Sequence, residues 1–271
     1  MSIGDVYMGI YIVTGGSKGI GEATVRLLRQ DGHKVVAVAR KNSDLNVDLG
    51  LPEGRRELIA ELHRMFPDGI DGLVSNAGIA SAKPLSRVLS VNYFGAVAVM
   101  EGLFDLLEKK HGRVCCVTSA SLAYGMEIGN RYNVDNLLVN CGEEARIGAL
   151  VDTFNPALVD NAIYGSTKMA LVRWVRRTAP GWALKGVTLN ALAPGAVDTS
   201  IMEGVEDMGQ DPEMGMAFPI PTLYRENRIM PPEHIAESIV YLVSENTQGL
   251  CGEVLYCDGG CAAVLHSEKY Y

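Results

Sequence analysis

The chain has 271 residues, of which 48% are hydrophobic, and a formal net charge of −8 at pH 7. That length and apolar content suffice for one large α/β domain with a full core, whereas the acidic balance argues against a nucleic-acid partner, since a phosphate-binding surface needs a basic patch. The first apolar run is too short to span a membrane and lacks a signal-peptide layout, so we expect a soluble cytoplasmic protein.

The N-terminal region predicts a strand, a glycine-rich turn and a helix. A short apolar run at residues 8–13 indicates a buried strand, the segment 14–21 reads TGGSKGIG, and a helix is expected over residues 22–30. This is the context that a dinucleotide site needs, because glycines let the backbone approach a pyrophosphate and the helix N-terminus supplies free N–H groups. A plain glycine-rich turn is the alternative. The residues expected to contact the cofactor here are Gly15, Ser17, Lys18, Gly19, Ile20 and Gly21.

The remaining elements alternate between strands and helices. Strands are predicted at residues 34–39, 72–75, 113–118, 187–193 and 253–257, and a further short strand is predicted to end near 47–48. Helices are predicted at 53–66, about 86–110, around Tyr164 as far as 179, and at 232–244. Such alternation indicates α/β architecture: a doubly wound, seven-stranded parallel sheet of the Rossmann type, with ligands at the carboxyl ends of the strands. No linker or repeat marks a boundary, so residues 1–271 are expected to form a single NAD(P)-binding domain.

The residue after the second strand bears on the choice of cofactor. A carboxylate there would hydrogen-bond the ribose 2′-hydroxyl of NAD, whereas this chain has Arg40 followed by Lys41. The planar fork of Arg40 suits a 2′-phosphate, and Lys18 adds a second cation in the glycine turn. Solvated loop charges are the alternative interpretation, but we expect NADP to be preferred over NAD.

Tyr164 and Lys168 form a Y-x-x-x-K pair that places a phenol and an ammonium on one helix face. A nearby positive charge favours the phenolate, which suits a general acid/base acting on a carbonyl oxygen or an alcohol. The pattern is weak on its own, since such pairs arise by chance. The six cysteines form no C-x-x-C pair, and the five histidines are scattered, so no metal site is expected.

Several motifs follow in the order of one known family. They are TGGSKGIG at 14–21, Ser75-Asn76-Ala77-Gly78, Val91-Asn92-Tyr93-Phe94-Gly95, Val117-Thr118-Ser119, Tyr164-x-x-x-Lys168, Pro194-Gly195-x-Val197-x-Thr199 and Asp258-Gly259-Gly260. Together they resemble the short-chain dehydrogenase/reductase family along almost the whole chain; the departure is Ser75, where that family often has asparagine.

The resemblance implies a role for each matched residue. Tyr164 would be the acid/base, Ser119 would orient the substrate carbonyl, Lys168 would also bind the nicotinamide ribose, and Asn92 would hold a water that relays protons. Further cofactor contacts would come from Asp48 and Leu49 at the adenine, from the segment Asn76, Ala77 and Gly78, and from Pro194, Gly195, Val197 and Thr199 near the nicotinamide. Hydride would pass between the cofactor and a carbonyl carbon.

Two segments bear on substrate and assembly. Tyr164 lies 45 positions after Ser119, which leaves an insertion at about 127–160 with two expected helices, at 132–141 and 143–154. A substrate lid is expected at about 198–231, and methionines there favour a bulky apolar substrate because methionine adapts to irregular shapes. The expected lid residues are Met202, Met208, Met214, Met216 and Phe218.

This layout resembles most the bacterial 3α-hydroxysteroid dehydrogenase/carbonyl reductase group of that family, which implies a 3-hydroxysteroid substrate of bile-acid type. Terpenoid or other alicyclic ketones are an alternative, and an NADP-binding redox sensor is a non-enzymatic one. A sugar-nucleotide epimerase would need a larger C-terminal domain. The insertion is expected to cover the tetramer surface used by relatives, which favours a homodimer through residues 232–257 over a tetramer.

Overall fold

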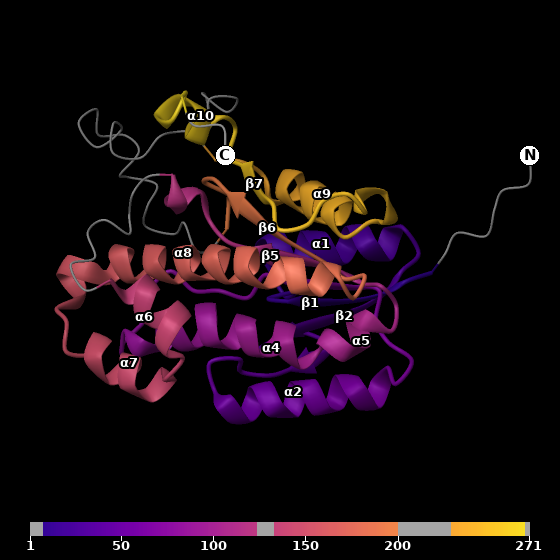
Figure 1. The fold of residues 1–271 in the computed structure, drawn as a ribbon, viewed down its shortest axis with the longest axis horizontal. Coiled ribbons are helices and arrows are strands. Elements are labelled where there is room, and N and C mark those ends of the chain that lie inside the picture. The colour runs from indigo at the N-terminus through magenta and orange to yellow at the C-terminus, as the bar shows by residue number, and fades with distance from the viewer. Residues whose placement is uncertain (1–7, 124–132, 200–228, 269–271) are drawn as a thin grey trace, which may run out of the picture.

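The structure is a computed structural model that describes residues 8–123, 133–199 and 229–268 (Figure 1). At its centre lies a seven-stranded parallel sheet with the order β3-β2-β1-β4-β5-β6-β7. The strands are β1 Ile10–Thr14, β2 Lys34–Ala39, β3 Leu45–Asn46, β4 Gly72–Ser75, β5 Arg113–Val117, β6 Thr188–Pro194 and β7 Val254–Cys257. The predicted doubly wound parallel sheet is confirmed, and its order reverses between β1 and β4, the point at which such sheets bind ligands.

Helices cover both faces of the sheet (Figure 1). On one face lie α1 Gly19–Gln30 and α9 Pro232–Leu242, which pack against each other and share an apolar core with β1 and β2. On the other face lie α2 Pro52–Met65, α4 Ala96–Gly102 and α8 Pro156–Ala183, which share a second core. Because both faces are buried, the inner strands are continuous apolar runs rather than alternating ones.

The helix expected over residues 86–110 is divided into several pieces. It consists of α3 Ser86–Leu89, the π-helical segment η1 Ser90–Gly95, α4, and α5 Phe104–Glu108. The π segment contains Asn92, in keeping with the occurrence of such bulges at functional sites. The sequence pattern gave no sign of this extra widening, because apolar spacing barely distinguishes the two kinds of helix.

Helix α8 extends further than the sequence predicted. It was expected to end at residue 179, but the helix passes through Pro180 to Ala183. The buried ring of Trp182 explains the extension, since its centre lies 4.7 Å from that of Phe104 and 5.9 Å from that of Trp174. Aromatic packing here offsets the hydrogen bond that proline cannot donate.

The expected insertion contains two short helices, α6 Val134–Cys141 and α7 Glu144–Val151, before the first turn of α8. They lie beside α4 and α8 at one end of the molecule (Figure 1). Helix α1 begins at Gly19 rather than at residue 22, and α9 ends at Leu242 rather than at 244. A short helix that was not predicted, α10 Cys261–Leu265, follows β7.

Candidate functional site

The expected site residues lie at the carboxyl ends of the strands or in the helices that follow them. They comprise Gly15 to Gly21 after β1, Arg40 after β2, Asp48 and Leu49 after β3, Asn76 to Gly78 after β4, Asn92 in η1, Ser119 after β5, Tyr164 and Lys168 in α8, and Pro194 to Thr199 at and beyond the end of β6. The expected lid residues Met202, Met208, Met214, Met216 and Phe218 lie outside the described residues.

The glycine turn after β1 is shaped to approach a ligand closely. Gly15 and Gly19 have φ angles of +69° and +57°, and a Cβ atom on Gly21 would lie 2.1 Å from the Gly15 carbonyl oxygen. The N-cap residue Lys18 makes no side-chain capping bond, and the first i to i−4 bond runs from the Glu22 N–H to the Lys18 carbonyl. The N–H groups before Glu22 and the positive end of the helix dipole therefore fit a pyrophosphate.

Thr14 fastens this turn to the end of β4. Its hydroxyl oxygen accepts hydrogen bonds from the N–H groups of Asn76 and Ala77 at 3.0 and 3.1 Å. The Asn76 side chain donates in return to the carbonyls of Thr14 and Gly15 at 3.2 and 3.4 Å. The two strand ends on either side of the switch point are thus held together.

Tyr164 and Lys168 lie one turn apart on α8, as their spacing predicted. Lys168 is 4% exposed, its Nζ lies 5.7 Å from the centre of the Tyr164 ring, and it donates to the Val117 carbonyl at 3.2 Å. Val117 ends β5, just before Ser119. Within the described part of the chain this carbonyl takes one of the three ammonium donors, and a buried cation needs polar partners. The remaining donors fit ligand hydroxyls such as those of a ribose.

Asn92 is fully buried, and its side-chain amide is occupied by the protein. Its Oδ1 accepts from the Ile79 N–H at 2.9 Å, and its Nδ2 donates to the Ile79 carbonyl at 2.9 Å and to Thr167 Oγ1 at 3.2 Å. A Cβ atom on Gly78 would lie 3.5 Å from both Asn92 Oδ1 and Lys168 Nζ. Asn92, Gly78 and Lys168 therefore lie close together, and the side-chain amide of Asn92 holds the segment after β4 against α8.

Ser119 begins the short 3₁₀ turn η2 Ala120–Leu122, and its hydroxyl oxygen accepts from the Ser121 N–H at 3.2 Å. This bond directs the Ser119 side chain, and η2 packs against α8. The C-terminal α10 region also reaches this turn, since a ring nitrogen of His266 lies 2.6 Å from the Ala123 carbonyl oxygen. That contact joins residues far apart in the sequence, so no local pattern could predict it.

At the expected adenine end, Asp48 is engaged by the protein. Its carboxylate accepts from the Gly50 N–H at 2.9 Å and forms an ion pair with Arg87. Burial raises the pKa of Asp48, but the hydrogen bonds of Arg87 and Gly50 and the charges of Arg87 and Arg40 outweigh it and hold that pKa below its usual value. Asp48 is therefore a carboxylate at neutral pH, with the exposed Arg40 within electrostatic range.

The segment after β6 pairs with the chain just before α9. Val197 and Met230 form an isolated bridge between backbones, and both side chains are buried in the core. Met230, at the end of the expected lid, thus belongs to the core. A Cβ atom on Gly195 would lie 2.9 Å from the Asp258 Cα, so the backbones cross closely there.

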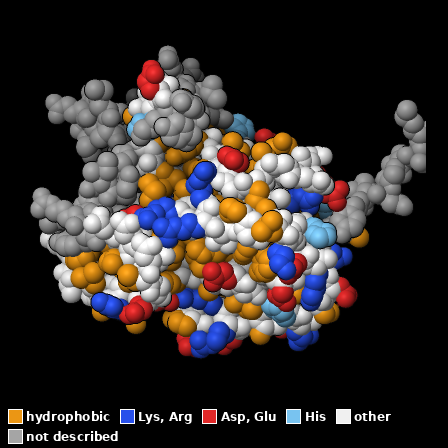
Figure 2. Space-filling view, in the orientation of Figure 1, with side chains coloured by type: hydrophobic (Ala, Val, Ile, Leu, Met, Phe, Trp, Pro, Cys, Tyr) orange, Lys and Arg blue, Asp and Glu red, His pale blue; other side chains and the backbone are white. Residues whose placement is uncertain are grey.

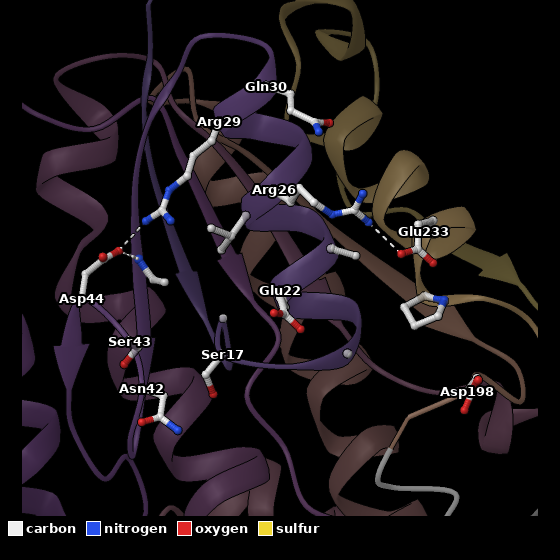
Figure 3. Close-up of a pocket in the computed structure, with 16 residues that line it drawn as sticks. Ser17, Glu22, Arg26, Arg29, Gln30, Asn42, Ser43, Asp44, Asp198 and Glu233 are labelled. Atoms are coloured by element: carbon white, nitrogen blue, oxygen red, sulfur yellow. Dashed lines mark hydrogen bonds and ion pairs between the residues drawn. The ribbon is translucent and has the colours of Figure 1, made fainter.

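A groove of about 1160 Å³ runs along α1 from the glycine turn (Figure 3). Its two arginines are already paired, Arg26 with Glu233 and Arg29 with Asp44, each at 2.7 Å. Ten of its sixteen lining residues are polar or charged, a lining that suits a polar ligand better than an apolar one. Gly16, Ser17 and Gly19 of the glycine turn are among its lining residues.

Two residues that the sequence analysis missed join parts of this site, namely Arg87, which pairs with Asp48, and Arg55, which contacts Leu49 and Ser90. Neither belongs to a motif, and their partners are distant in sequence. Among the described residues no cluster of metal-binding side chains occurs, and no helix there is long and apolar enough to cross a membrane.

Comparison with known proteins gives consistent matches. Residues 9–134 match the family described as short chain dehydrogenase, and residues 153–262 match the one described as enoyl-(acyl carrier protein) reductase. The chain is 33% identical to 3-alpha-hydroxysteroid dehydrogenase/carbonyl reductase of Comamonas testosteroni over 97% of this chain and 100% of that protein. It is 28% identical to coniferyl-alcohol dehydrogenase of a Pseudomonas strain, over 93% and 96%.

A solved structure supports the same grouping. The crystal structure of the 3-alpha-hydroxysteroid dehydrogenase from Pseudomonas sp. B-0831, complexed with NADH, superposes with a TM-score of 0.84 at 30% identity. The match covers 96% of this chain and 100% of that one.

Proposed function

Because this chain belongs to the short-chain dehydrogenase/reductase family of oxidoreductases, we propose that it transfers hydride between NADP and a ketone or secondary alcohol on a bulky apolar substrate, most specifically a 3-hydroxysteroid of bile-acid type. The observation that carries the proposal is the buried Lys168 beside Tyr164, fixed to the end of the strand that leads to Ser119.

Tyr164 would give a proton to the carbonyl oxygen, or take one from the alcohol, while Ser119 orients that oxygen. Lys168 would bind the ribose, and a water held by the Asn92 segment would pass protons on to solvent. The bound nicotinamide supplies or accepts the hydride. The protein's share of the chemistry is positioning and polarisation.

NADP is proposed as the preferred cofactor because Arg40 and Lys18 supply cations where a 2′-phosphate would lie, and no carboxylate occupies the position after β2. NAD is the competing possibility, which the NADH bound to the Pseudomonas enzyme favours. Both carboxylate oxygens of Asp48 accept from Arg87 Nη2, so Asp48 would meet the adenine edge through the lone pairs that remain.

The steroid assignment rests on the two 3-alpha-hydroxysteroid dehydrogenases among the relatives and on the methionine-rich segment after β6. Reduction of terpenoid or other alicyclic ketones is the second candidate, because carbonyl reductase is part of the name of the Comamonas relative. We propose further that the protein forms a homodimer and that it is located in the cytoplasm.

The test compares kcat/KM for 3-oxosteroids with that for cyclohexanone and small terpenoid ketones at saturating NADPH. Each buried methylene is worth about 0.8 kcal/mol, so a site that encloses the remote rings should favour the steroid by several powers of ten. Equal values would mean that only the reacting ring is recognised, and the steroid assignment would be withdrawn in favour of a general carbonyl reductase.

A further inference from the structure

Arg55, on the first turn of α2, is a buried cation with four hydrogen bonds to three separate segments. It is 6% exposed; its Nε donates to the Leu49 carbonyl at 2.7 Å and its Nη2 to the Ser90 carbonyl at 2.8 Å. Its Nη1 and Nη2 also donate to the two carboxylate oxygens of Glu144 at 2.6 and 2.8 Å. This bidentate ion pair and the two hydrogen bonds to backbone carbonyls fix the planar guanidinium in one orientation.

Two of the three segments belong to the proposed site. Leu49 follows Asp48 in the loop expected to meet the adenine, and Ser90 opens the π segment that carries Asn92. The two segments are in close contact, because a Cβ atom on Gly95 would lie 2.8 Å from the Leu49 carbonyl oxygen and 3.0 Å from that of Ser90. Arg55 therefore bridges the cofactor loop and the proton-relay segment.

The third segment is the insertion, whose helix α7 is fastened at both ends. Glu144 holds Arg55 at its start, and Asp152 at its C-cap accepts a hydrogen bond from the Ser86 N–H at 2.8 Å. Between them Ile147 and Val151 are buried in the core. The insertion is thus attached to the segment from α3 to η1 at both ends of α7. Glu144 pairs with Arg55, which binds the Ser90 carbonyl, and Asp152 accepts from the Ser86 N–H.

We infer that Arg55 is a positioning residue for hydride transfer and that Glu144 makes the insertion part of the cofactor site. This inference rests on the proposed function, since it needs a cofactor bound at Asp48 and a proton relay at Asn92. The guanidinium sets the distance between the Leu49 and Ser90 carbonyls, and Glu144 fixes the guanidinium. Cofactor affinity and turnover at saturating cofactor therefore depend on the same ion pair. A buried ion pair that served stability alone would affect neither.

The test uses variants with matched neighbours. Glu144→Gln removes the charge but keeps the shape, and Arg55→Lys keeps a charge but cannot reach three acceptors at once. The controls are Glu143→Gln and Arg56→Lys, adjacent residues whose own ion pairs, with Arg146 and Glu53, are exposed. Binding is measured by fluorescence titration with NADPH and NADH, and by calorimetry with ADP-ribose and its 2′-phosphate, which represent the adenine half alone. Turnover is measured at saturating cofactor, and thermal unfolding is followed in parallel.

We expect Glu144→Gln and Arg55→Lys to weaken binding about fivefold or more, measured with ADP-ribose if the enzyme prefers NADH and with its 2′-phosphate if it prefers NADPH. Both variants should also lower kcat about tenfold or more, while both controls behave as wild type. Wild-type affinity and kcat in Glu144→Gln would overturn the inference, even if its melting temperature falls. A loss confined to binding or to kcat would overturn the coupling between them. A wild-type protein that binds neither NADPH nor NADH would instead overturn the proposed function on which the inference rests.

Discussion

At the scale of single residues, two tyrosines differ in their burial and in their charged neighbours. Burial of Tyr93, in the π segment, raises its pKa to about 12, so it keeps its proton throughout the neutral range. Tyr164 is only partly buried and has the Lys168 ammonium 5.7 Å from its ring centre. A phenol that exchanges a proton with a substrate needs an open face, which Tyr164 has and Tyr93 lacks.

Tyr164→Phe is therefore expected to remove the proton shuttle while leaving cofactor binding intact. kcat should fall by about 10²–10⁴-fold, as for a lost general acid, and the dissociation constant for NADPH should barely change. Steady-state kinetics and fluorescence titration measure the two quantities. Tyr93→Phe is the control and should keep kcat near that of the wild type, whereas near-normal turnover in Tyr164→Phe would refute the assignment.

Arg40 is the residue on which the cofactor proposal depends. Arg40→Asp should repel a 2′-phosphate and offer a ribose hydroxyl a carboxylate, so KM for NADPH should rise about tenfold or more, the worth of a charge-assisted hydrogen bond, and KM for NADH should fall. The control Lys41→Asp changes the neighbouring charge and should have a smaller effect. A wild type with a higher kcat/KM for NADH than for NADPH would show that the interpretation of Arg40 and Lys18 is wrong.

At the scale of elements, the sequence predicted what short-range chemistry determines. The strands at residues 34–39 and 72–75 were placed with correct bounds, because buried parallel strands are apolar throughout and end at turn residues. The motifs also pointed to Tyr164, Lys168, Asn92 and Ser119; the structure joins Asn92 and the end of β5 to the helix of Tyr164 and Lys168, and the roles of these residues stay predictions. What escaped were features set by distant partners: the passage of α8 through Pro180, which Trp182 holds in the core, and the Arg55 and Arg87 ion pairs.

The contact between α2 and α5 predicts how stability changes with pH. The His63 ring nitrogens lie 2.8 Å from the Ile59 carbonyl and 2.8 Å from Asp105 Oδ1, both acceptors, so both nitrogens donate only in the protonated ring. Burial lowers the pKa of His63, but these hydrogen bonds and the Asp105 charge outweigh it and raise that pKa above 6.5. The stabilisation is therefore complete below about pH 6.5 and is lost as pH rises through the higher folded-state pKa.

We expect His63→Gln to reduce the unfolding free energy more at pH 5.5 than at pH 8.5. The difference should be under about 1 kcal/mol, because the pair is partly exposed. Urea unfolding at both pH values measures it, and Asp105→Asn should reproduce the effect. A difference of the opposite sign would contradict the assignment of a raised pKa.

At the scale of the whole molecule, the insertion closes one surface and the sheet leaves another open. Helix α6 is fastened to α8, since Arg173 donates to Asp135 at 2.6 Å and Arg177 to Asn140 at 3.0 Å. That side of α8 is therefore covered by the chain itself. Strand β7 is one edge of the sheet, and its residues Leu255 and Tyr256 are exposed. Apolar side chains gather over the region of β6 and β7 in Figure 2.

An exposed apolar edge strand invites pairing with another chain, so we predict a homodimer formed through β7 and α9. Leu255→Glu, or the same change at Tyr241 on α9, should place a charge in the buried interface and cost about 2 kcal/mol or more, converting the dimer to monomers at micromolar concentration. Light scattering coupled to gel filtration measures the mass. Leu184→Glu is the control, because Leu184 is 88% exposed just beyond α8 and away from β7. A tetramer would show that α6 does not block the surface of α8, and a dimer that persists in Leu255→Glu and Tyr241→Glu would place the interface elsewhere.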